Sequence, residues 1–244
     1  MDELRGKTVL VTGGAVRVGR ALAIGLAQAG MRVALHYGGS AQAAEATAGE
    51  IRALGGEVAV FQADFRVAYP AAVELVQAAA ARFGQVDVLI NNAAIFEAAT
   101  LVETSAEQYD RHLEINLKAA FFAAQAFVGQ LPEGAEGQIL NINDWRVARP
   151  HGTHLAYELS KAGLDALTRA LAVDLAPRVR VNQIALGAIL PPPEAAPDYF
   201  EKKARRIPLR RTGSPEDVVQ AALYLLSAGF VTGETVVVTG GEHL

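Results

Sequence analysis

The sequence predicts an α/β protein, in which one doubly wound domain holds a seven-stranded parallel sheet with helices on both faces. Short runs rich in β-branched residues alternate strictly with longer amphipathic runs along the 244 residues, and this alternation is typical of a parallel sheet. Ala, Val and Leu make up much of a hydrophobic fraction of 51%, as buried strands under helices require. No repeat, low-complexity linker or composition break divides the chain, so we expect a single domain over residues 1–244.

The individual elements follow from local patterns. Strands are expected at residues 7–11, 32–37, 57–61, 86–90, 137–142, 179–185 and 234–238. Helices are expected at residues 19–29, 41–54, 71–83, 105–128, 153–175 and 215–228. The last helix has the clearest start, because Ser214 is a capping residue, Pro215 suits the first helical position, and two acids follow in the first turn.

One long irregular segment, residues 187–211, follows the sixth predicted strand. It contains three consecutive prolines at 191–193 and a short helical stretch near 199–206. Loops of this length in compact domains are usually functional or disordered. We interpret the segment as a lid over a substrate site, and a plain surface insertion is the alternative.

Composition and charge argue against several classes of protein. No apolar run approaches the ~18 residues of a membrane span, and the first residues lack the pattern of a secretory signal. The absence of cysteine excludes disulfides and thiolate metal sites. A net charge of −4 argues against a polyanionic partner, and His151 and His154 have no third metal ligand at a recognisable spacing. We expect a cytoplasmic protein that acts on a small molecule and binds no nucleic acid, membrane or metal.

A glycine-rich turn follows the first predicted strand. Residues 12–19 have the sequence TGGAVRVG and lead into a helix. Glycine permits a tight turn there and lets backbone N–H groups approach a pyrophosphate at the positive end of the helix. The spacing differs from the common G-x-G-x-x-G pattern, but its position after the first strand of a Rossmann-type sheet predicts a dinucleotide site.

The end of the second predicted strand favours NADPH. Enzymes that prefer NAD usually present a carboxylate there to hold the ribose 2′-hydroxyl, whereas residues 36–40 read HYGGS and contain no acid. Ser40, the loop amides and the nearby Arg17 are suited to a 2′-phosphate that a carboxylate would repel. A cation at the start of a helix opposes the helix dipole, so Arg17 indicates an anionic ligand, with a solvated surface residue as the alternative.

Tyr157 and Lys161 are four residues apart in a predicted helix and therefore project from one face. A phenol titrates near ~10, which is too high for a good proton donor at neutral pH. An ammonium ~4 Å away at an effective dielectric of 20 is worth about 4 kcal/mol, an upper bound of roughly three pK units. We therefore expect Lys161 to bring the pKa of Tyr157 towards the working range of a general acid.

Over essentially its full length, the chain resembles the short-chain dehydrogenase/reductase family. The matching motifs are residues 12–19, Asp64, the NNAA run at 91–94, Asn116, Tyr157-x-x-x-Lys161 and Gly240-Gly241. The resemblance implies that Tyr157 is the general acid, that Lys161 binds the nicotinamide ribose and lowers the tyrosine pKa, that Asn116 supports a proton relay, and that Asp64 meets the adenine. The cofactor-binding set is then Thr12, Gly13, Arg17, Val18, Gly19, His36, Tyr37, Ser40, Asp64, Phe65, Asn92, Ala93, Ala94, Tyr157, Lys161 and Gly187.

Two positions depart from the family pattern. Asp144 stands where most members carry a serine, and Leu186-Gly187 replaces the usual Pro-Gly after the sixth strand. An ionised Asp144 would raise the pKa of Tyr157, and a protonated Asp144 would instead donate a hydrogen bond or a proton. Either state favours protonation of the substrate, so we interpret the protein as a reductase with Asp144, Tyr157, Lys161 and Asn116 as catalytic residues.

The Asp144 substitution, together with Arg17 and residues 36–40, resembles the pteridine reductase and dihydromonapterin reductase branch. That branch also has an aromatic residue where Phe96 stands, so a flat pterin is expected to stack between Phe96 and the nicotinamide. The substrate-binding set is Arg17, Phe96, Asp144 and Tyr157. The chain lacks the basic residue often found at position 39 and has Ala94 where a serine contacts the pterin, and Phe96 as ordinary loop packing stays open.

Two other functions remain as alternatives. The first is a general carbonyl reductase, including one for 3-oxoacyl thioesters. The second, from a different class, is a dinucleotide sensor or scaffold without turnover, against which the intact Tyr157, Lys161 and Asn116 argue. The predicted helices 105–128 and 153–175 carry much apolar surface, and their counterparts in the family pair across subunits, so the resemblance implies a homotetramer with 222 symmetry.

Overall fold

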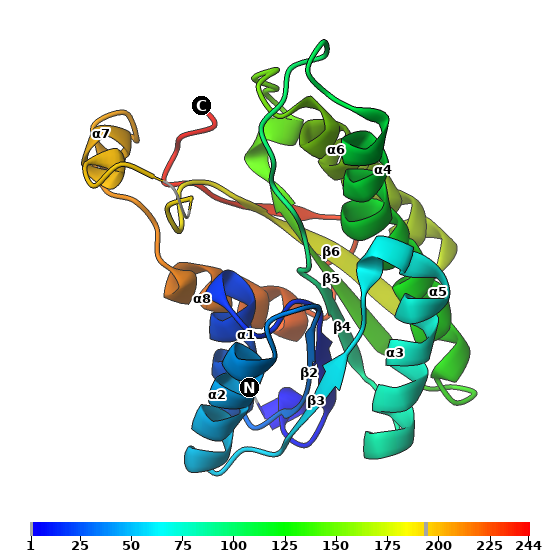
Figure 1. Cartoon of the computed structure of the whole chain (residues 1–244). Helices are drawn as coiled ribbons and strands as arrows, with labels where there is room; N and C mark the ends of the chain where they lie inside the picture. Colours follow the sequence, from blue (N-terminus) through cyan, green and yellow to red (C-terminus); the bar gives the residue numbers. More distant parts are fainter. Residues whose placement is uncertain (1, 193–194) are drawn as a thin grey trace.

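A fully parallel seven-stranded sheet runs through the middle of the protein, with the strand order β3-β2-β1-β4-β5-β6-β7 (Figure 1). The computed structural model describes residues 2–192 and 195–244. The strands are β1 (Thr8–Val11), β2 (Arg32–Tyr37), β3 (Val58–Gln62), β4 (Val88–Asn91), β5 (Gly137–Asp144), β6 (Val179–Leu186) and β7 (Thr235–Val238). The predicted fold class is confirmed, and each predicted strand lies within two residues of an observed one.

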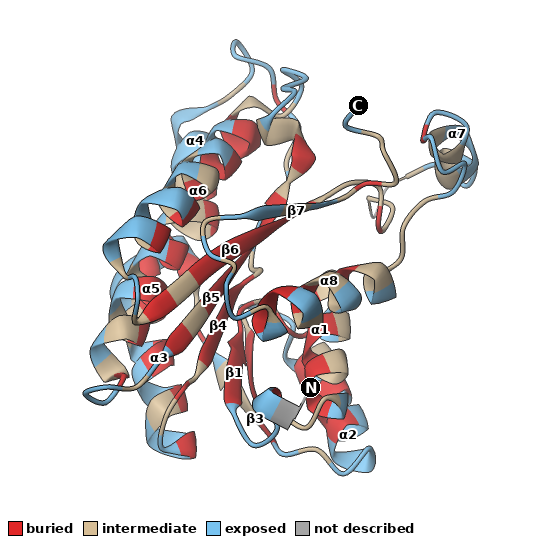
Figure 2. Ribbon diagram, turned by 180° about the vertical axis from the view of Figure 1, so that it is seen from behind, coloured by how far each residue is buried: buried red, intermediate tan, exposed pale blue. Residues whose placement is uncertain are grey.

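Helices cover both faces of the sheet because successive residues of its strands point in opposite directions. In β1, Val9 and Val11 pack into one core cluster and Leu10 into the other. Figure 2 shows buried residues along the strands and on the inward faces of the helices. The first cluster includes α1 (Arg17–Gln28), α2 (Ala41–Ala53) and α8 (Pro215–Ser227), and the second includes α3 (Ala68–Phe83), α5 (Ala119–Gln130) and part of α6 (Leu155–Asp174).

The order of the strands reverses between β1 and β4. Strand β1 pairs with β2 on one side and with β4 on the other, in the register Val9↔Val88, Leu10↔Leu89 and Val11↔Ile90. The loops that leave the carboxyl ends of these two strands turn to opposite faces, which opens a crevice at that edge. The glycine turn after β1 and the loop that follows β4 therefore meet at the place where open α/β sheets bind ligands.

A π-helical turn interrupts the helix predicted at 105–128. Helix α4 (Ala106–Leu113) leads into a π-helix at Glu114–Lys118, which continues as α5. Asn116 lies in the wide turn and is only 2% exposed. Such turns are frequent at functional sites. The hydrophobic pattern predicted the extent of the helix but not the π-helical turn, because one widened turn barely changes the period.

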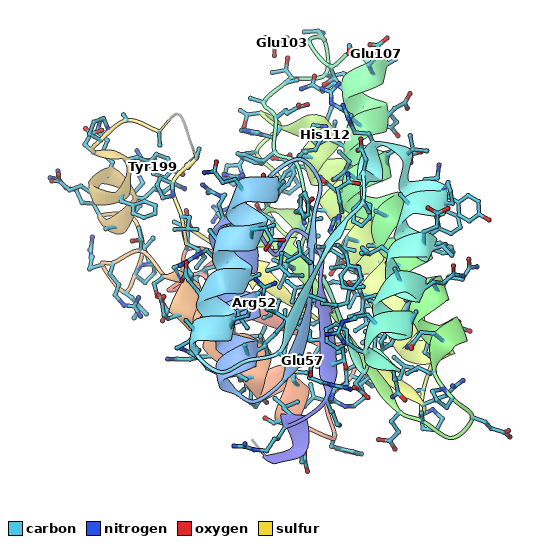
Figure 3. The ribbon with its side chains drawn as sticks, turned by 60° about the horizontal axis from the view of Figure 1, so that its bottom comes forward. Arg52, Glu57, Glu103, Glu107, His112 and Tyr199 are labelled. Atoms are coloured by element: carbon cyan, nitrogen blue, oxygen red, sulfur yellow. The ribbon has the colours of Figure 1, made fainter. Side chains whose placement is uncertain are left out.

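The segment after β6 contains the short helix α7 (Tyr199–Ala204), close to the predicted helical stretch. Residues 193 and 194, which include the last of the three consecutive prolines, lie outside the described residues. Helix α7 stands away from the sheet and its covering helices, and Figure 3 shows Tyr199 on this outlying helix (Figures 1 and 3). No helix in the described part of the chain is long and apolar enough to cross a membrane.

Candidate active site

Helix α1 begins without a capping side chain. Its N-cap residue is Val16, in an extended conformation, and its first turn contains no acid. The starts of α4 and α8 differ, because Ser105 accepts from Gln108 N at α4, and Ser214 and Asp217 form a capping box at α8, whereas α2, α3 and α6 also lack a side-chain cap. The first N–H groups of a helix have no partner inside the helix. Those of α1 are therefore left to an acceptor from outside, as at an anion-binding helix terminus.

The glycine turn is fixed by close packing against the loop after β4. Gly13 has a φ of +63°, and a Cβ on Gly19 would lie 2.1 Å from Gly13 O and 2.5 Å from Asn92 Nδ2. The Asn92 amide donates to Thr12 O at 2.9 Å and to Gly13 O at 3.1 Å. Thr12 Oγ1 accepts from the backbone N–H groups of Asn92 and Ala93. The structure thus brings together two predicted motifs that are 80 residues apart in the chain.

His36 supports this turn from β2. Its Nδ1 accepts from Gly13 N and its Nε2 lies 3.0 Å from Ala63 O, while the ring stacks on Phe65 at 4.5 Å. Burial lowers the pKa of His36 to about 4. A neutral ring with its proton on Nε2 satisfies both contacts. Both ring nitrogens are engaged within the protein, so His36 shapes the glycine turn rather than offering a nitrogen to a ligand.

The other residues expected around the adenine and its ribose lie near the ends of β2 and β3. Ser40 is exposed and forms no side-chain cap for α2. Tyr37 ends β2 and is half-buried. Asp64 pairs with Arg66, its Oδ2 lying 2.6 Å from Arg66 Nη2, and its hydrogen bonds from Arg66 hold the pKa of Asp64 below its usual value. A ligand that takes the carboxylate of Asp64 must therefore share it with Arg66.

Arg17 joins the glycine turn to the segment after β6. Its backbone is left-handed, with a φ of +55°, which is uncommon outside glycine and worth attention at a functional site. Its guanidinium donates to Pro191 O at 2.8 Å. At the start of this segment Gly187 N donates to Val238 O, and a Cβ there would lie 2.9 Å from Thr239 Cα. The turn at Gly187 is thus pressed against the end of β7.

Tyr157 and Asp144 meet at the carboxyl end of β5. Asp144 is the last residue of that strand, and its Oδ2 accepts a 2.9 Å hydrogen bond from Tyr157 Oη. Its Oδ1 accepts from Arg146 N at the start of a 3₁₀ turn, Trp145–Val147. Burial, followed by the charge of Asp144, raises the pKa of Tyr157 well above its usual value. The phenol therefore keeps its proton throughout the neutral range.

Lys161 lies one turn further along α6 and is also buried. Its Nζ donates to Ile142 O at 2.8 Å and lies 5.9 Å from the centroid of the Tyr157 ring. Burial lowers the pKa of Lys161 to about 8, against the charge of Asp144, which raises it. The expectation that Lys161 lowers the phenol's pKa is wrong for this structure, because burial and Asp144 set the direction of the shift. The expected effect of an ionised Asp144 has the right sign.

Asn116 connects the loop after β4 to α6. Its Nδ2 donates to Ile95 O and to Ser160 Oγ, and its Oδ1 accepts from Ile95 N. Ser160 in turn donates to Tyr157 O at 2.7 Å. This buried chain of hydrogen bonds fixes the helix turn that carries the phenol. Sequence reasoning missed Ser160, because a serine inside a helix gives no signal of its partner.

Phe96 packs against the ring of Tyr157 in an aromatic cluster. Its ring stacks on His154 at 4.1 Å and meets Tyr157 edge-on at 4.7 Å. Backbone bonds between Ala99 and residues 153 and 155 hold the two loops together. The guanidinium carbon of Arg146 lies 5.1 Å from the Phe96 ring centroid, and Arg146 Nη1 lies 3.8 Å from Asp144 Oδ2. Phe96 remains 40% exposed, and no local pattern predicts that His154 or Arg146 lies beside it.

Comparison with known proteins decides the family. A family model described as enoyl-(acyl carrier protein) reductase matches residues 14–243. The chain belongs to the short-chain dehydrogenase/reductase family. Within that family, the 3-oxoacyl-acyl-carrier-protein reductase FabG of Staphylococcus epidermidis is 34% identical over 98% of this chain and 99% of that protein. The 3beta-hydroxysteroid dehydrogenase 1 of Eggerthella lenta is 36% identical over 100% of this chain and 96% of that protein.

A solved structure of this short-chain dehydrogenase/reductase family is also very similar. It is the FolM alternative dihydrofolate reductase 1 of Brucella canis, complexed with NADP, with a TM-score of 0.94 and 35% identity over 98% of this chain and 95% of that chain. This chain is accordingly an oxidoreductase whose structural homologues bind NADP. The three relatives carry different substrate names at similar identity, so the comparisons establish the chemistry but leave the substrate open.

The residues of this short-chain dehydrogenase/reductase fit a dinucleotide. The uncapped start of α1 supplies free N–H donors, and the missing Cβ atoms at Gly13 and Gly19 let the backbone fold tightly beneath them. Val18 is half-buried in the first turn, and Ala94 is exposed on the loop after β4. Lys161 and Tyr157 lie at the same edge of the sheet, at the end of β5. When bound, a nicotinamide would supply a hydride there.

Proposed function

We propose that the protein is an NADPH-dependent reductase of dihydropterins or related planar pteridines. One observation supports this most: Tyr157 Oη donates to the carboxylate of Asp144, beside the exposed Phe96 ring. A buried phenol with a raised pKa holds its proton for delivery to a substrate. The likeness to a FolM alternative dihydrofolate reductase favours the pteridine class. Phe96, with His154 stacked on its ring and the Arg146 guanidinium over it, remains 40% exposed and gives the substrate an apolar wall beside Tyr157.

In the proposed reaction a C=N or C=O bond gains a hydride on carbon and a proton on nitrogen or oxygen. The Tyr157 O–H bond breaks as the new N–H or O–H bond forms. Asp144 then relays a proton from solvent to the phenolate, and the ammonium of Lys161 stabilises the negative charge of the phenolate until that proton arrives. Asn116 and Ser160 hold the phenol in position. Lys161 would also bind the nicotinamide ribose.

The preference for NADPH over NADH is part of the proposal. The end of β2 presents Tyr37, two glycines and Ser40, without a carboxylate that would repel a 2′-phosphate. Arg17 supplies positive charge at the glycine turn. The NADP in the Brucella canis relative is consistent with this preference. Titration of cofactor fluorescence with NADPH and NADH would test it, and equal affinities would contradict it.

We further propose that residues 1–244 form one domain with a lid at 187–211, and that the protein is a cytoplasmic homotetramer. The tetramer is supported by exposed apolar side chains on the helices that pair in the family. Tyr109 lies on α4, Phe121 on α5, and Leu159 and Val173 on α6. Light scattering would test the assembly state, and a monomer at micromolar concentration would contradict it.

A second candidate function is reduction of 3-oxoacyl thioesters or other ketones, which the FabG relative supports. Steady-state assays with dihydrobiopterin, dihydromonapterin and acetoacetyl thioesters would separate the two. Turnover of a dihydropterin at least tenfold more efficient than that of any thioester supports our proposal. Turnover of a ketone without any pterin turnover would contradict it, and no turnover at all would favour the sensor or scaffold.

A further inference from the structure

Arg146 stands at the active site with its hydrogen-bonding capacity unused. Within residues 2–192 and 195–244, its guanidinium donates no hydrogen bond, although its backbone N–H donates to Asp144 Oδ1. The nearest carboxylate oxygen, Asp144 Oδ2, lies 3.8 Å from Nη1, beyond hydrogen-bonding distance. The side chain is 21% exposed, so its N–H groups remain open to a ligand.

The position of the guanidinium is set from two sides. Its carbon lies 5.1 Å from the centroid of the Phe96 ring, within the range of a cation–π contact. The charge of Asp144 holds it from the other side. A guanidinium is a planar fork of five donors that suits carbonyl and carboxylate oxygens. Arg146 is therefore a positioned donor rather than a freely solvated cation.

Two donors lie around the same carboxylate oxygen in this arrangement. Tyr157 Oη lies 2.9 Å and Arg146 Nη1 lies 3.8 Å from the same oxygen, Asp144 Oδ2. A substrate that takes the proton of Tyr157 on one atom would bring a neighbouring acceptor atom towards Arg146. A dihydropterin has such a pair, because its imine nitrogen and its ring carbonyl oxygen are joined through two carbons. A 1,2-dicarbonyl compound has the same relationship between its two oxygens.

We propose that Arg146 is a further substrate-binding residue, which donates to a second acceptor atom of the substrate, separated by two carbons from the atom that Tyr157 protonates. This inference rests on the proposed reductase function and adds a rule of selectivity to it. Substrates with two neighbouring acceptors, such as dihydropterins and planar 1,2-dicarbonyls, are preferred over ketones with one. Arg146 takes the acceptor next to the reacting bond, whereas Arg17 lies at the glycine turn on the other side of the sheet crevice.

The test compares isatin, a planar bicyclic 1,2-dicarbonyl, with 1-indanone, a monoketone of similar shape, and with dihydrobiopterin. In Arg146→Met, kcat/KM for dihydrobiopterin and isatin should fall about tenfold to a hundredfold, the loss expected for a hydrogen bond from a charged donor. The value for 1-indanone should stay within about threefold. Arg146→Lys should lie between, because it keeps the charge but loses the fork.

Arg149→Met provides the matched control, because Arg149 is exposed and, among the described residues, its side chain forms a hydrogen bond only to Leu244 O at 3.4 Å. Affinity for NADPH should be unchanged in every variant, which shows that the fold and the glycine turn are intact. The same substitution in an Asp144→Asn background separates a direct contact from an effect through Asp144. A direct contact predicts the same selective loss there.

Equal losses for isatin and 1-indanone, or a loss that vanishes in the Asp144→Asn background, would overturn the inference. A selective loss on isatin without any turnover of dihydrobiopterin would support Arg146 while rejecting the pteridine function. If the wild type reduces none of the three, calorimetric titration of biopterin into the NADP⁺ complex decides. A tenfold weaker Kd in Arg146→Met then supports the inference, and an unchanged Kd or no binding at all rejects it.

Discussion

Tyr157 in α6 and Asp144 at the end of β5 are joined by a 2.9 Å hydrogen bond in which the phenol is the donor. This contact ties the proposed proton source to the sheet, so removal of the hydroxyl should separate chemistry from binding. We expect Tyr157→Phe to lower kcat at least about a hundredfold, the lower range for loss of a general acid. Fluorescence titration should find NADPH affinity within about threefold of the wild type. Full activity in this variant would show that another group delivers the proton.

The charge of Asp144 also leads to a prediction about pH. It contributes to the raised pKa of Tyr157, so Asp144→Asn should lower that pKa and let the phenol lose its proton at a lower pH. The asparagine also lacks a transferable proton. Both effects make the variant's loss of reductase activity larger at high pH than at low pH. Rate profiles from pH 6 to 10 check this, and a constant ratio of variant to wild type would contradict it.

Substitution of Gly19 tests whether the glycine turn binds the cofactor. A Cβ there would lie 2.1 Å from Gly13 O, so Gly19→Ala must displace the backbone at the start of α1. We expect NADPH affinity to fall at least about tenfold, because the N–H groups no longer converge. Gly49→Ala is the matched control, since Gly49 lies inside α2 with open space around a Cβ. It should stabilise the fold by about 0.5–1 kcal/mol in urea unfolding. Equal NADPH affinity in both variants would contradict the assignment.

His36 should make the fold sensitive to acid. Its pKa is about 4 in the folded protein and near 6.5 in the unfolded chain, so the unfolded chain binds the extra proton between these values. The free energy of unfolding should therefore fall as pH drops through that window, by on the order of 3 kcal/mol. Comparison with His36→Gln by urea unfolding isolates this contribution. Equal slopes of stability against pH in the two proteins would contradict it.

The elements and the main site could be predicted because their signals are local. Strands and helices follow from apolar periodicity, and the sequence of β1 with its glycines identifies the dinucleotide edge. Tyr157 and Asp144 were expected to be neighbours, and the structure brings them together. The partners of these groups depend on packing between distant segments, which no local pattern encodes. Ser160 beneath Asn116, and His154 and Arg146 around Phe96, became visible only in three dimensions.

The electrostatic expectation for Lys161 failed for a related reason. Spacing along a helix predicts which side chains share a face, but not which acceptor the ammonium finds. Lys161 donates to Ile142 O, and burial acts on it and on Tyr157 alike. The desolvation of both groups outweighs the attraction that their spacing suggests.

The uncapped start of α1 has a further consequence for the stability of the folded protein. The N-termini of α4 and α8 are capped by their own side chains, whereas the first N–H groups of α1 have no such acceptor and would be stabilised by a bound dinucleotide. Thermal stability would therefore depend on the concentration of free cofactor. Every tenfold rise in free dinucleotide above its Kd adds about 1.4 kcal/mol to the free energy of unfolding. A shortage of reducing cofactor would then shorten the lifetime of the chain as well as slow its chemistry.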